Sequence, residues 1–410
     1  MKTEINSSEL LTLFNISSNI DKLKLLEDIG DGIVDPGLVL SLVSRLVLSE
    51  LNNNMYPKLL TGNDFKRIIE ENNFKNKLNE FIGNESNSCS GLLFKKAFDL
   101  MLYKNDFGLP KILLRTIIKE SPDLFLMLLQ WLRLNEKEIN SDERKGILAT
   151  ITVLSWFGQD NVKYVKESWE NLSKPTFWTK GFVSRPFYQK NELLIYPLVS
   201  PDLLRSHLIG SVVNVNDKWP YYPKKESEII RQYKKEIFNI ENKAFDLANK
   251  IWRDFFDKLE NCKSLILYAQ REYISKCFGD YCTTEKIYQE HFRSWDWDNI
   301  LPSKWLYYNF GLSSNTKLWD RSIGSYRALS IFERKVDNDT VCPKARLEDN
   351  MEQSFVKEND WLFWSQIEKT FVEEDTEMIK IHLSATVHRL CNIYEEWYSS
   401  LSVSKLFGSE

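Results

Sequence analysis

The chain has 410 residues, of which 43% are hydrophobic and 27% are charged. This composition is typical of folded proteins and not of disordered ones, and the length favours two or three domains. The formal net charge of −4 excludes a positive field over the whole molecule. Any contact with nucleic acid must therefore be local.

The N-terminal segment and the cysteines indicate a cytoplasmic protein that makes no membrane contact. Residues 1–6 are polar and lack the apolar segment of a secretory signal. The most apolar run, 124–129, is far shorter than the roughly 20 residues that cross a bilayer. The six cysteines form no Cys-x-x-Cys pair, so we expect free thiols.

Residues 1–171 are expected to form an N-terminal helical domain. The clearest helix start is Ser121-Pro122-Asp123, which combines a capping hydroxyl, a proline suited to the first helical position and an acidic residue suited to the helix dipole. Ser141 begins a similar signal. The sequence therefore predicts helices that start near Pro122 and Ser141.

Residues 172–226 are expected to be an irregular connector, because prolines and aromatic residues interrupt the helical pattern. Residues 227–410 are expected to form a second helical domain with an insert at about 291–347. Apolar residues at three- and four-residue spacing predict one long amphipathic helix over Ser227–Leu259 and a closing helix over 376–401.

The insert differs from the rest of the chain. Trp295 and Trp297 alternate with Asp296 and Asp298, which predicts a half-buried strand. Between residues 293 and 347 there are nine lysines and arginines and six acidic residues. Basic side chains interleaved with tryptophans can hold phosphates, but an ordinary solvated loop has the same composition. Both interpretations stay open at this point.

Four segments of the insert resemble the HNH half of the modification-dependent restriction endonucleases of the GmrSD type and their anti-phage relatives. Members show a Trp-Asp-Tyr/Trp-Asp-His-Ile-x-Pro segment, a Ser-Ile-Gly-Asn turn, an Asn-Arg-x-Asp segment and a Pro-x-x-Lys-Leu segment. The corresponding residues here are 295–302, 322–325, 333–337 and 343–347. Residues 265–273 resemble the helix that precedes this region in the family, and residues 109–134 resemble its middle region more weakly.

The resemblance implies a mainly α protein with a small ββα-metal element and one divalent metal, Mg²⁺ or Mn²⁺. Asp298 matches the metal-binding aspartate, and Glu333 is the second candidate ligand. Asn299 stands where the family has its general-base histidine, and Ser325 replaces the turn asparagine. A carboxamide cannot accept the proton, and loss of a general base removes about two to four orders of magnitude of rate. His291 and Asp296 are the candidates for a substitute base.

The resemblance also implies contacts with DNA and a partner protein. The candidate DNA-binding residues are Arg293, Arg321, Arg327, Arg334 and Lys335. The Asp-Gly-Gln-Gln-Arg motif of the family's nucleotide-hydrolysing half does not occur in this chain. A partner protein that supplies this half is one explanation, and loss of both activities is the other.

Three functions follow as hypotheses. The favoured one is a catalytically degenerate HNH-family protein that acts as a DNA-binding or regulatory component of a prokaryotic anti-phage or restriction-type defence system. The first alternative is an active metal-dependent DNA endonuclease with a relocated general base. The second alternative is a protein-interaction scaffold that uses the predicted helix Ser227–Leu259 as its docking surface.

Overall fold

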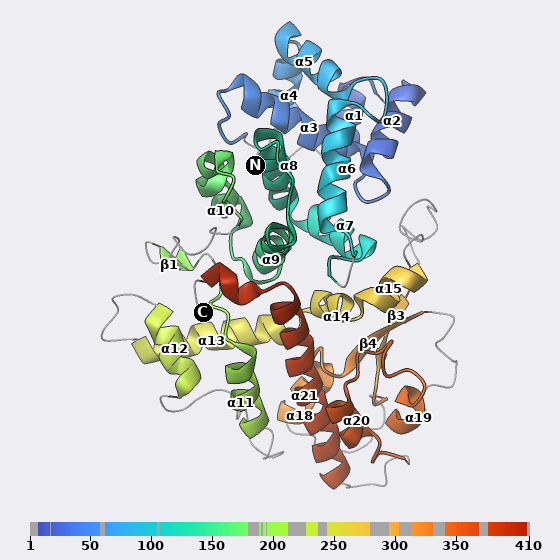
Figure 1. Ribbon diagram of the computed structural model, residues 1–410, viewed down its shortest axis with the longest axis vertical. Coiled ribbons are helices and arrows are strands. Elements are labelled where there is room, and N and C mark those ends of the chain that lie inside the picture. Colours follow the sequence, from blue (N-terminus) through green and yellow to red (C-terminus); the bar gives the residue numbers. More distant parts are fainter. Residues whose placement is uncertain are drawn as a thin grey trace. The chain divides into compact units, whose positions relative to one another are not determined.

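The structure is a computed structural model. It describes residues 7–16, 18–57, 62–104, 107–178, 188–189, 192–193, 195–211, 227–236, 244–278, 295–302, 314–330, 341–368 and 376–407. These residues are mainly helical, which confirms the predicted mainly α class (Figure 1). Within these ranges, every helix is too short or too polar to cross a bilayer.

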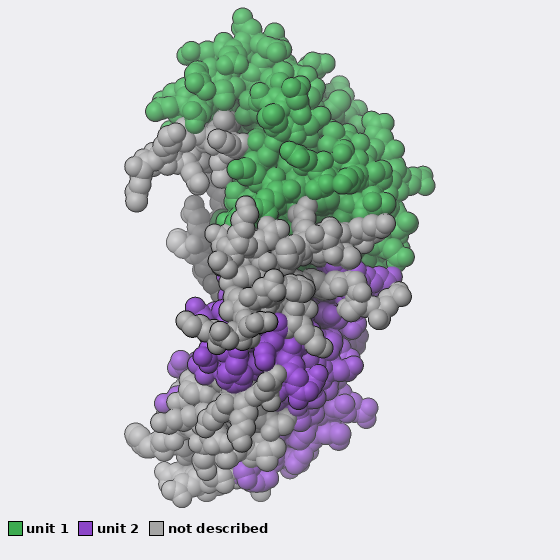
Figure 2. All heavy atoms as spheres, turned by 90° about the vertical axis from the view of Figure 1, so that its left-hand side faces the viewer, with its two compact units in different colours: residues 1–155, 160–181, 279–286 green, residues 156–159, 182–278, 287–410 purple. Residues whose placement is uncertain are grey.

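The chain forms two compact units, which Figure 2 distinguishes by colour. Unit 1 consists of residues 1–155, 160–181 and 279–286, and unit 2 consists of residues 156–159, 182–278 and 287–410. The described parts of the expected connector that follow residue 181 belong to unit 2.

The described part of unit 1 consists of helices. In chain order these are α1 (Ser7–Leu13), α2 (Ile20–Gly30), α3 (Pro36–Leu51), α4 (Gly62–Ile69), α5 (Asn72–Ile82), α6 (Cys89–Met101), α7 (Lys111–Glu120), α8 (Pro122–Leu134), α9 (Ser141–Phe157), α10 (Asn161–Ser168) and the 3-10 helix η1 (Trp169–Ser173). The predicted starts at Pro122 and Ser141 are confirmed.

Helix α8 lies in the core of unit 1, since every residue from Asp123 to Leu132 is buried. Asp123 was expected to act on the helix dipole, but its carboxylate also joins α8 to α3. Its Oδ1 accepts hydrogen bonds from Arg45 Nη2 at 2.6 Å and from the Tyr56 hydroxyl at 2.7 Å. Burial and this carboxylate raise the pKa of Tyr56 well above its ordinary value. A buried ion pair thus fixes the start of α8.

Unit 2 combines helices with two short antiparallel strand pairs, β1 with β2 and β3 with β4. Its elements are β1 (Tyr188–Gln189), β2 (Glu192–Leu193), α11 (Pro201–Ser211), α12 (Glu228–Glu236), α13 (Ala244–Glu260), α14 (Lys263–Ala269), α15 (Arg271–Phe278), β3 (Trp295–Asn299), α18 (Ser314–Arg321), β4 (Tyr326–Ser330), α19 (Pro343–Leu347), α20 (Glu358–Trp364), α21 (Thr376–Ser400) and η3 (Val403–Phe407).

The prediction of one long helix over Ser227–Leu259 is wrong. The ring of Tyr233 in α12 lies 5.9 Å from the ring of Trp252 in α13. On one continuous helix these residues would be about 28 Å apart along the axis, at 1.5 Å per residue. Helices α12 and α13 are therefore separate, and their apolar faces pack against each other.

Helix α21 confirms the predicted closing helix and runs through the core of unit 2 (Figure 1). It packs against α11, α14, α18 and α20. Its fully buried apolar residues follow helical spacing and include Leu383, Val387, Leu390, Tyr394 and Trp397. The helix thereby provides a rigid support for the loop between α18 and β4.

Candidate functional site

The predicted strand at the tryptophan-aspartate repeat is confirmed as β3, which pairs with β4. In the antiparallel register Asp298 lies opposite Arg327, and Asn299 lies opposite Tyr326. Successive side chains of a strand point to opposite faces. Trp297, Asn299 and Tyr326 therefore share one face of the strand pair, and Asp298 and Arg327 share the other.

The outer edge of β4 is covered by side chains from the junction of α14 and α15. The Gln270 amide donates from Nε2 to the Ala328 carbonyl at 3.1 Å, and its Oε1 accepts from the Ala328 amide at 2.8 Å. The Tyr273 hydroxyl accepts from the Ser330 amide at 3.0 Å. Gln270 thus makes both hydrogen bonds that a neighbouring strand would make. It also separates α14 from α15, so the region over 265–273 that resembles one helix of the family forms two helices.

The turn over residues 322–325 lies against α21. A Cβ atom on Gly324 would come within 2.0 Å of the Thr386 carbonyl oxygen, which belongs to α21. Backbone this close leaves no room for a side chain, so the position requires glycine. The glycine of the Ser-Ile-Gly segment therefore has a packing explanation in this fold.

Arg389 of α21 holds the same turn in place through hydrogen bonds to backbone carbonyl oxygens. Its guanidinium is fully buried and donates to the carbonyl oxygens of Gly324 at 2.9 Å, Tyr326 at 2.6 Å and Ser354 at 2.7 Å. Burial lowers the pKa of Arg389 to about 9. Because the donors of this arginine are used by backbone carbonyls, the turn cannot shift without leaving them unpaired.

Ser325, which replaces the family's turn asparagine, uses its hydroxyl inside its own turn. The side chain is buried, and its Oγ donates towards the carbonyls of Asp320 and Ser322, the latter at 3.1 Å. Its carbonyl accepts from the Ile300 amide at 2.9 Å. The residue thus ties the turn to the end of β3.

The carboxylate of Asp298 is held by two arginines. Arg327 Nε lies 2.9 Å from Oδ2, and Arg346 Nη1 lies 3.0 Å from Oδ1. The three side chains are only 3–4% exposed. Arg346 Nη1 also donates to the Asn299 carbonyl at 2.7 Å, and Arg327 Nη1 donates to Ser354 Oγ at 2.9 Å. One buried ion cluster therefore joins β3, β4 and α19.

These residues do not fit a divalent metal ion. Both oxygens of Asp298 already accept from a guanidinium, and two positive charges this close oppose the approach of a third cation. Within the described ranges, no group of three or more histidine, cysteine, aspartate or glutamate residues is arranged to hold a metal. Arg327 and Arg346 thus occupy the carboxylate that the resemblance assigns to the metal.

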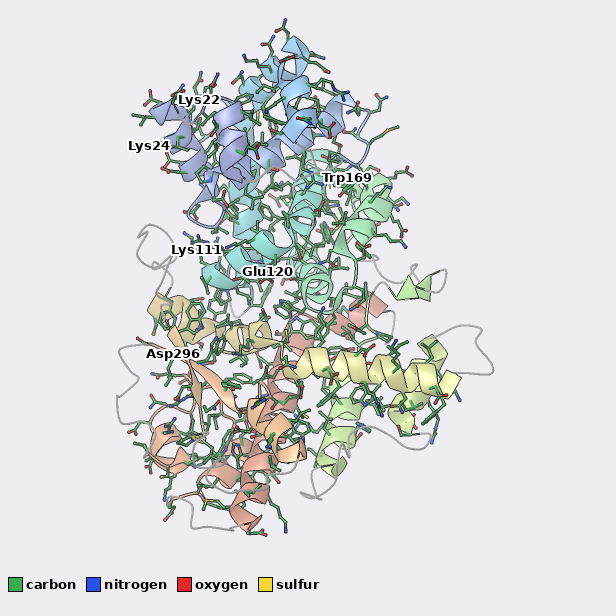
Figure 3. The ribbon with its side chains drawn as sticks, turned by 180° about the vertical axis from the view of Figure 1, so that it is seen from behind. Lys22, Lys24, Lys111, Glu120, Trp169 and Asp296 are labelled. Carbon is green, nitrogen blue, oxygen red and sulfur yellow. The ribbon has the colours of Figure 1, made fainter. Side chains whose placement is uncertain are left out.

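The remaining predicted site residues lie at separate positions, and several lie outside the described residues. Arg327, expected to contact DNA, points instead into the buried ion cluster, so contact with a phosphate would require this cluster to open. Arg321 is exposed at the end of α18, and Asn299 is half-buried at the end of β3. Asp296, labelled in Figure 3, accepts from the Trp297 amide at 2.8 Å. His291, Arg293, Glu333, Arg334 and Lys335 lie outside the described residues.

One buried histidine has a carboxylate neighbour that sequence inspection missed. His382 Nε2 lies 3.6 Å from Asp320 Oδ1, and its Nδ1 accepts from Trp364 Nε1 at 3.4 Å. Both His382 and Asp320 are buried. Local spacing gives no signal for this pair, because α18 and α21 are far apart in the sequence. The histidine packs in the core, as expected for a structural residue.

A lysine covers two aromatic rings on the opposite face of the strand pair from Asp298. Lys263 Nζ lies 5.0 Å from the ring centroid of Trp297 and 5.0 Å from that of Tyr326. Lys263 is exposed and both rings are half-buried. Such distances are typical of cation–π contacts. Sequence inspection missed this group, because Lys263 belongs to α14 and not to the insert.

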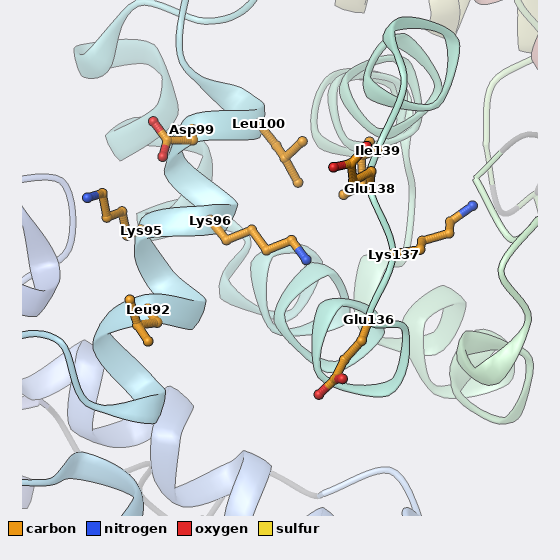
Figure 4. A pocket seen from close by; sticks show the side chains of 9 residues that line it. All are labelled: Leu92, Lys95, Lys96, Asp99, Leu100, Glu136, Lys137, Glu138 and Ile139. Carbon is orange, nitrogen blue, oxygen red and sulfur yellow. The ribbon is translucent and has the colours of Figure 1, made fainter.

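A separate groove lies in unit 1 between α6 and the segment after α8 (Figure 4). Its volume is about 820 Å³. The lining side chains are Leu92, Lys95, Lys96, Asp99, Leu100, Glu136, Lys137, Glu138 and Ile139. Three lysines face three acidic residues, so the groove has no net charge that would select a charged ligand.

Comparison of the sequence with protein-family models gives no match, and comparisons with curated proteins and with solved structures give none either. The resemblance to HNH nucleases therefore depends on the motif residues alone.

Proposed function

We propose that this chain is a catalytically inactive, HNH-like DNA-binding component of a prokaryotic anti-phage or restriction-type defence system. The observation that carries the proposal is the pairing of Asp298 with Arg327 and Arg346, next to an asparagine at the expected position of the general base. The insert contains two paired strands, β3 and β4, and the later helix α19, although α18 lies between the two strands and interrupts the simple ββα order that the resemblance implies.

Loss of activity follows from two chemical changes at the same site. Asn299 has no basic nitrogen, so it cannot activate water near neutral pH. The Asp298 carboxylate is neutralised by internal guanidinium groups, so it offers little attraction to Mg²⁺ or Mn²⁺. Either change alone lowers the rate, and together they remove both the base and the Lewis acid of the family's reaction.

DNA binding is supported by positive charge that stays exposed in unit 2. Lys263 of α14 and Lys317 and Arg321 of α18 are exposed. The turn over 322–325 directly follows α18, and its Ile323 amide donates to the carbonyl of Glu260 at 2.8 Å, three residues before Lys263. A local basic surface of this kind can contact phosphates although the chain is acidic as a whole.

A partner protein completes the proposed system. In the family that the insert resembles, nucleotide hydrolysis belongs to a half marked by Asp-Gly-Gln-Gln-Arg, which this sequence lacks. We therefore propose that a separate protein supplies that half and that this chain contributes DNA contact.

The two alternatives receive less support from the described residues. An active nuclease with a relocated base still needs a metal, and the carboxylate expected to hold it is bound by two arginines. The scaffold hypothesis relied on one long helix, which is in fact the packed pair α12 and α13.

The test is equilibrium binding of the full chain to a fluorescent DNA duplex at about 50 and about 200 mM salt. We expect binding that weakens as the salt concentration rises. We expect Arg321→Ala to reduce the slope of the logarithm of the binding constant against the logarithm of salt concentration by about the contribution of one phosphate contact. Lys380→Ala removes an exposed lysine of α21 that pairs with Glu377 and serves as the matched control. Absence of salt-dependent binding to any DNA would overturn the proposal.

A further inference from the structure

We propose that Trp297 and Tyr326, together with Lys263, form a stacking site for an unpaired nucleobase of single-stranded DNA. This inference deepens the DNA-binding function proposed above and rests on it.

The strand register brings the two rings to one surface. Trp297 lies opposite Ala328, and Tyr326 is two residues before Ala328 on the same strand. Diagonal neighbours of this kind lie about 7–8 Å apart, within reach of aromatic side chains. Both rings are half-buried, so each keeps part of its surface open to solvent. The two rings thus lie on one face of the strand pair, with the Lys263 ammonium 5.0 Å from each ring centroid.

The Trp297 ring is contacted by a second tryptophan on the same face of β3. The ring of Trp295 contacts it edge-on with centroids 6.5 Å apart, and Trp295 itself is buried against Phe278 at 5.8 Å. A ring that is held in this way loses little conformational entropy when it binds a ligand. This rigidity favours stacking over a loose hydrophobic contact.

Lys263 supplies the charge that a nucleotide requires. Its ammonium lies 5.0 Å from both ring centroids and is exposed, so it can pair with a phosphate while the base stacks on a ring. Glu260 precedes it closely in the chain, but burial raises the pKa of this carboxyl to about 8. This shift reduces the negative charge that Glu260 carries at neutral pH, three residues before Lys263.

The chemistry fits single strands better than duplexes. Base stacking on aromatic rings needs an exposed base face, which a paired duplex offers only at its ends. Stacking on an aromatic ring is tolerant of sequence, because every base has a π-face. We therefore expect little sequence preference.

The experiment compares binding of the full chain to oligothymidine of about 16 nucleotides and to a duplex, by fluorescence anisotropy. We expect Trp297→Leu to weaken single-strand binding by about 5- to 150-fold, the effect of losing one stacked base, while duplex binding stays within about twofold. Trp297→Phe keeps a ring and should retain most of the affinity. Tryptophan fluorescence should also be quenched by oligothymidine in the wild type and less in Trp297→Leu.

Two matched controls separate stacking from folding. Lys263→Ala removes the ammonium from the proposed site. Lys357 lies over the Phe355 ring at 5.6 Å in the same unit, so Lys357→Ala removes a similar cation–π contact at another position. Trp361 is a half-buried tryptophan of α20, so Trp361→Leu matches Trp297→Leu. Only the variants at Lys263 and Trp297 should lose single-strand affinity.

The outcomes distinguish this inference from the proposed function. If the wild type binds neither DNA, the proposed DNA-binding function fails and the stacking site fails with it. If the wild type binds the duplex but Trp297→Leu binds oligothymidine as tightly as Trp361→Leu does, only the stacking site is refuted. Selective loss of single-strand binding in Trp297→Leu, recovered in Trp297→Phe, supports both.

Discussion

Arg346 Nη1 lies 3.0 Å from Asp298 Oδ1 and 2.7 Å from the Asn299 carbonyl oxygen, so a single guanidinium joins α19 to the end of β3. Arg327 completes the cluster from β4. A carboxylate that the resemblance assigns to metal binding thus serves as the counter-ion of two buried arginines. Breaking such a cluster costs far more than disrupting an exposed pair.

Removal of the central carboxylate should strongly destabilise unit 2. Asp298→Asn leaves two buried guanidinium groups without a counter-ion, and we expect a loss of about 3–5 kcal/mol in the free energy of unfolding. Urea unfolding measures it. Asp296→Asn, on the half-buried neighbouring position, is the control and should change stability by less than about 1 kcal/mol. Equal effects of the two substitutions would show that the ion cluster contributes little.

Glycine at position 324 should be essential for packing. In Gly324→Ala the new Cβ would overlap the Thr386 carbonyl oxygen, and overpacking of this kind costs about 1–3 kcal/mol or more. Gly30→Ala in α2 is the control, because its Cβ would meet Val39 at an ordinary 3.4 Å. Thermal unfolding of both variants checks this. A Gly324→Ala protein as stable as Gly30→Ala would mean that the turn can move away from α21.

Gln270 should protect the edge of β4. In Gln270→Leu the Ala328 amide and carbonyl lose their partners, and each buried unpaired group costs about 1–3 kcal/mol. We expect faster hydrogen exchange at the Ala328 amide together with lower stability. Gln366→Leu, which removes an exposed hydrogen bond to Leu362, should change neither. Unaltered exchange at Ala328 would contradict the role of Gln270 as a strand partner.

Glu260 should make stability depend on pH. Burial raises the pKa of Glu260 from 4.5 to about 8. Between these two pH values the folded state therefore keeps a proton that the unfolded state has already released. The free energy of unfolding should therefore fall as the pH rises from about 4.5 to 8 and then level off. Glu260→Gln should remove this part of the pH dependence and be more stable than wild type near pH 9. Urea unfolding at several pH values measures it, and parallel pH profiles would refute it.

Restoring the family's polar residues should not restore cleavage. Asn299→His and Ser325→Asn together supply the base and its orienting amide, but Asp298 stays bound to Arg327 and Arg346. We expect no metal-dependent nicking of plasmid DNA by this double variant. Its unfolding midpoint, measured alongside, shows whether the protein is folded. Cleavage by the double variant would show that a metal can displace an arginine from Asp298.

Local signals in the sequence were sufficient for several elements. Pro122 and Ser141 mark the starts of α8 and α9, and the tryptophan-aspartate alternation predicts β3. Each of these signals lies within the element it specifies. The closing helix α21 likewise follows from its own apolar spacing. The expected capping by the Ser121 hydroxyl is wrong, because this side chain makes no capping hydrogen bond and accepts from Asn161 Nδ2 instead.

Features that depend on distant contacts could not be predicted. The spacing of apolar residues is the same for one long helix and for α12 packed against α13, because both bury the same face. Arg327 looks like any basic residue of a DNA-binding loop until the register places it opposite Asp298. Lys263 in α14 contacts the Trp297 ring, and Gln270 after α14 pairs with Ala328 of β4. These contacts join residues that are distant in the sequence, so only the fold reveals them.

The most direct test of the central claim is plasmid cleavage by the wild-type protein in Mg²⁺ and in Mn²⁺, beside Asp298→Ala. Asp298 is held by Arg327 and Arg346, and asparagine stands at the position where the resemblance expects the base. If the proposed function holds, neither protein should show metal-dependent cutting. Cutting by the wild type that is lost in Asp298→Ala would contradict the claim and show that Asp298 binds a catalytic metal.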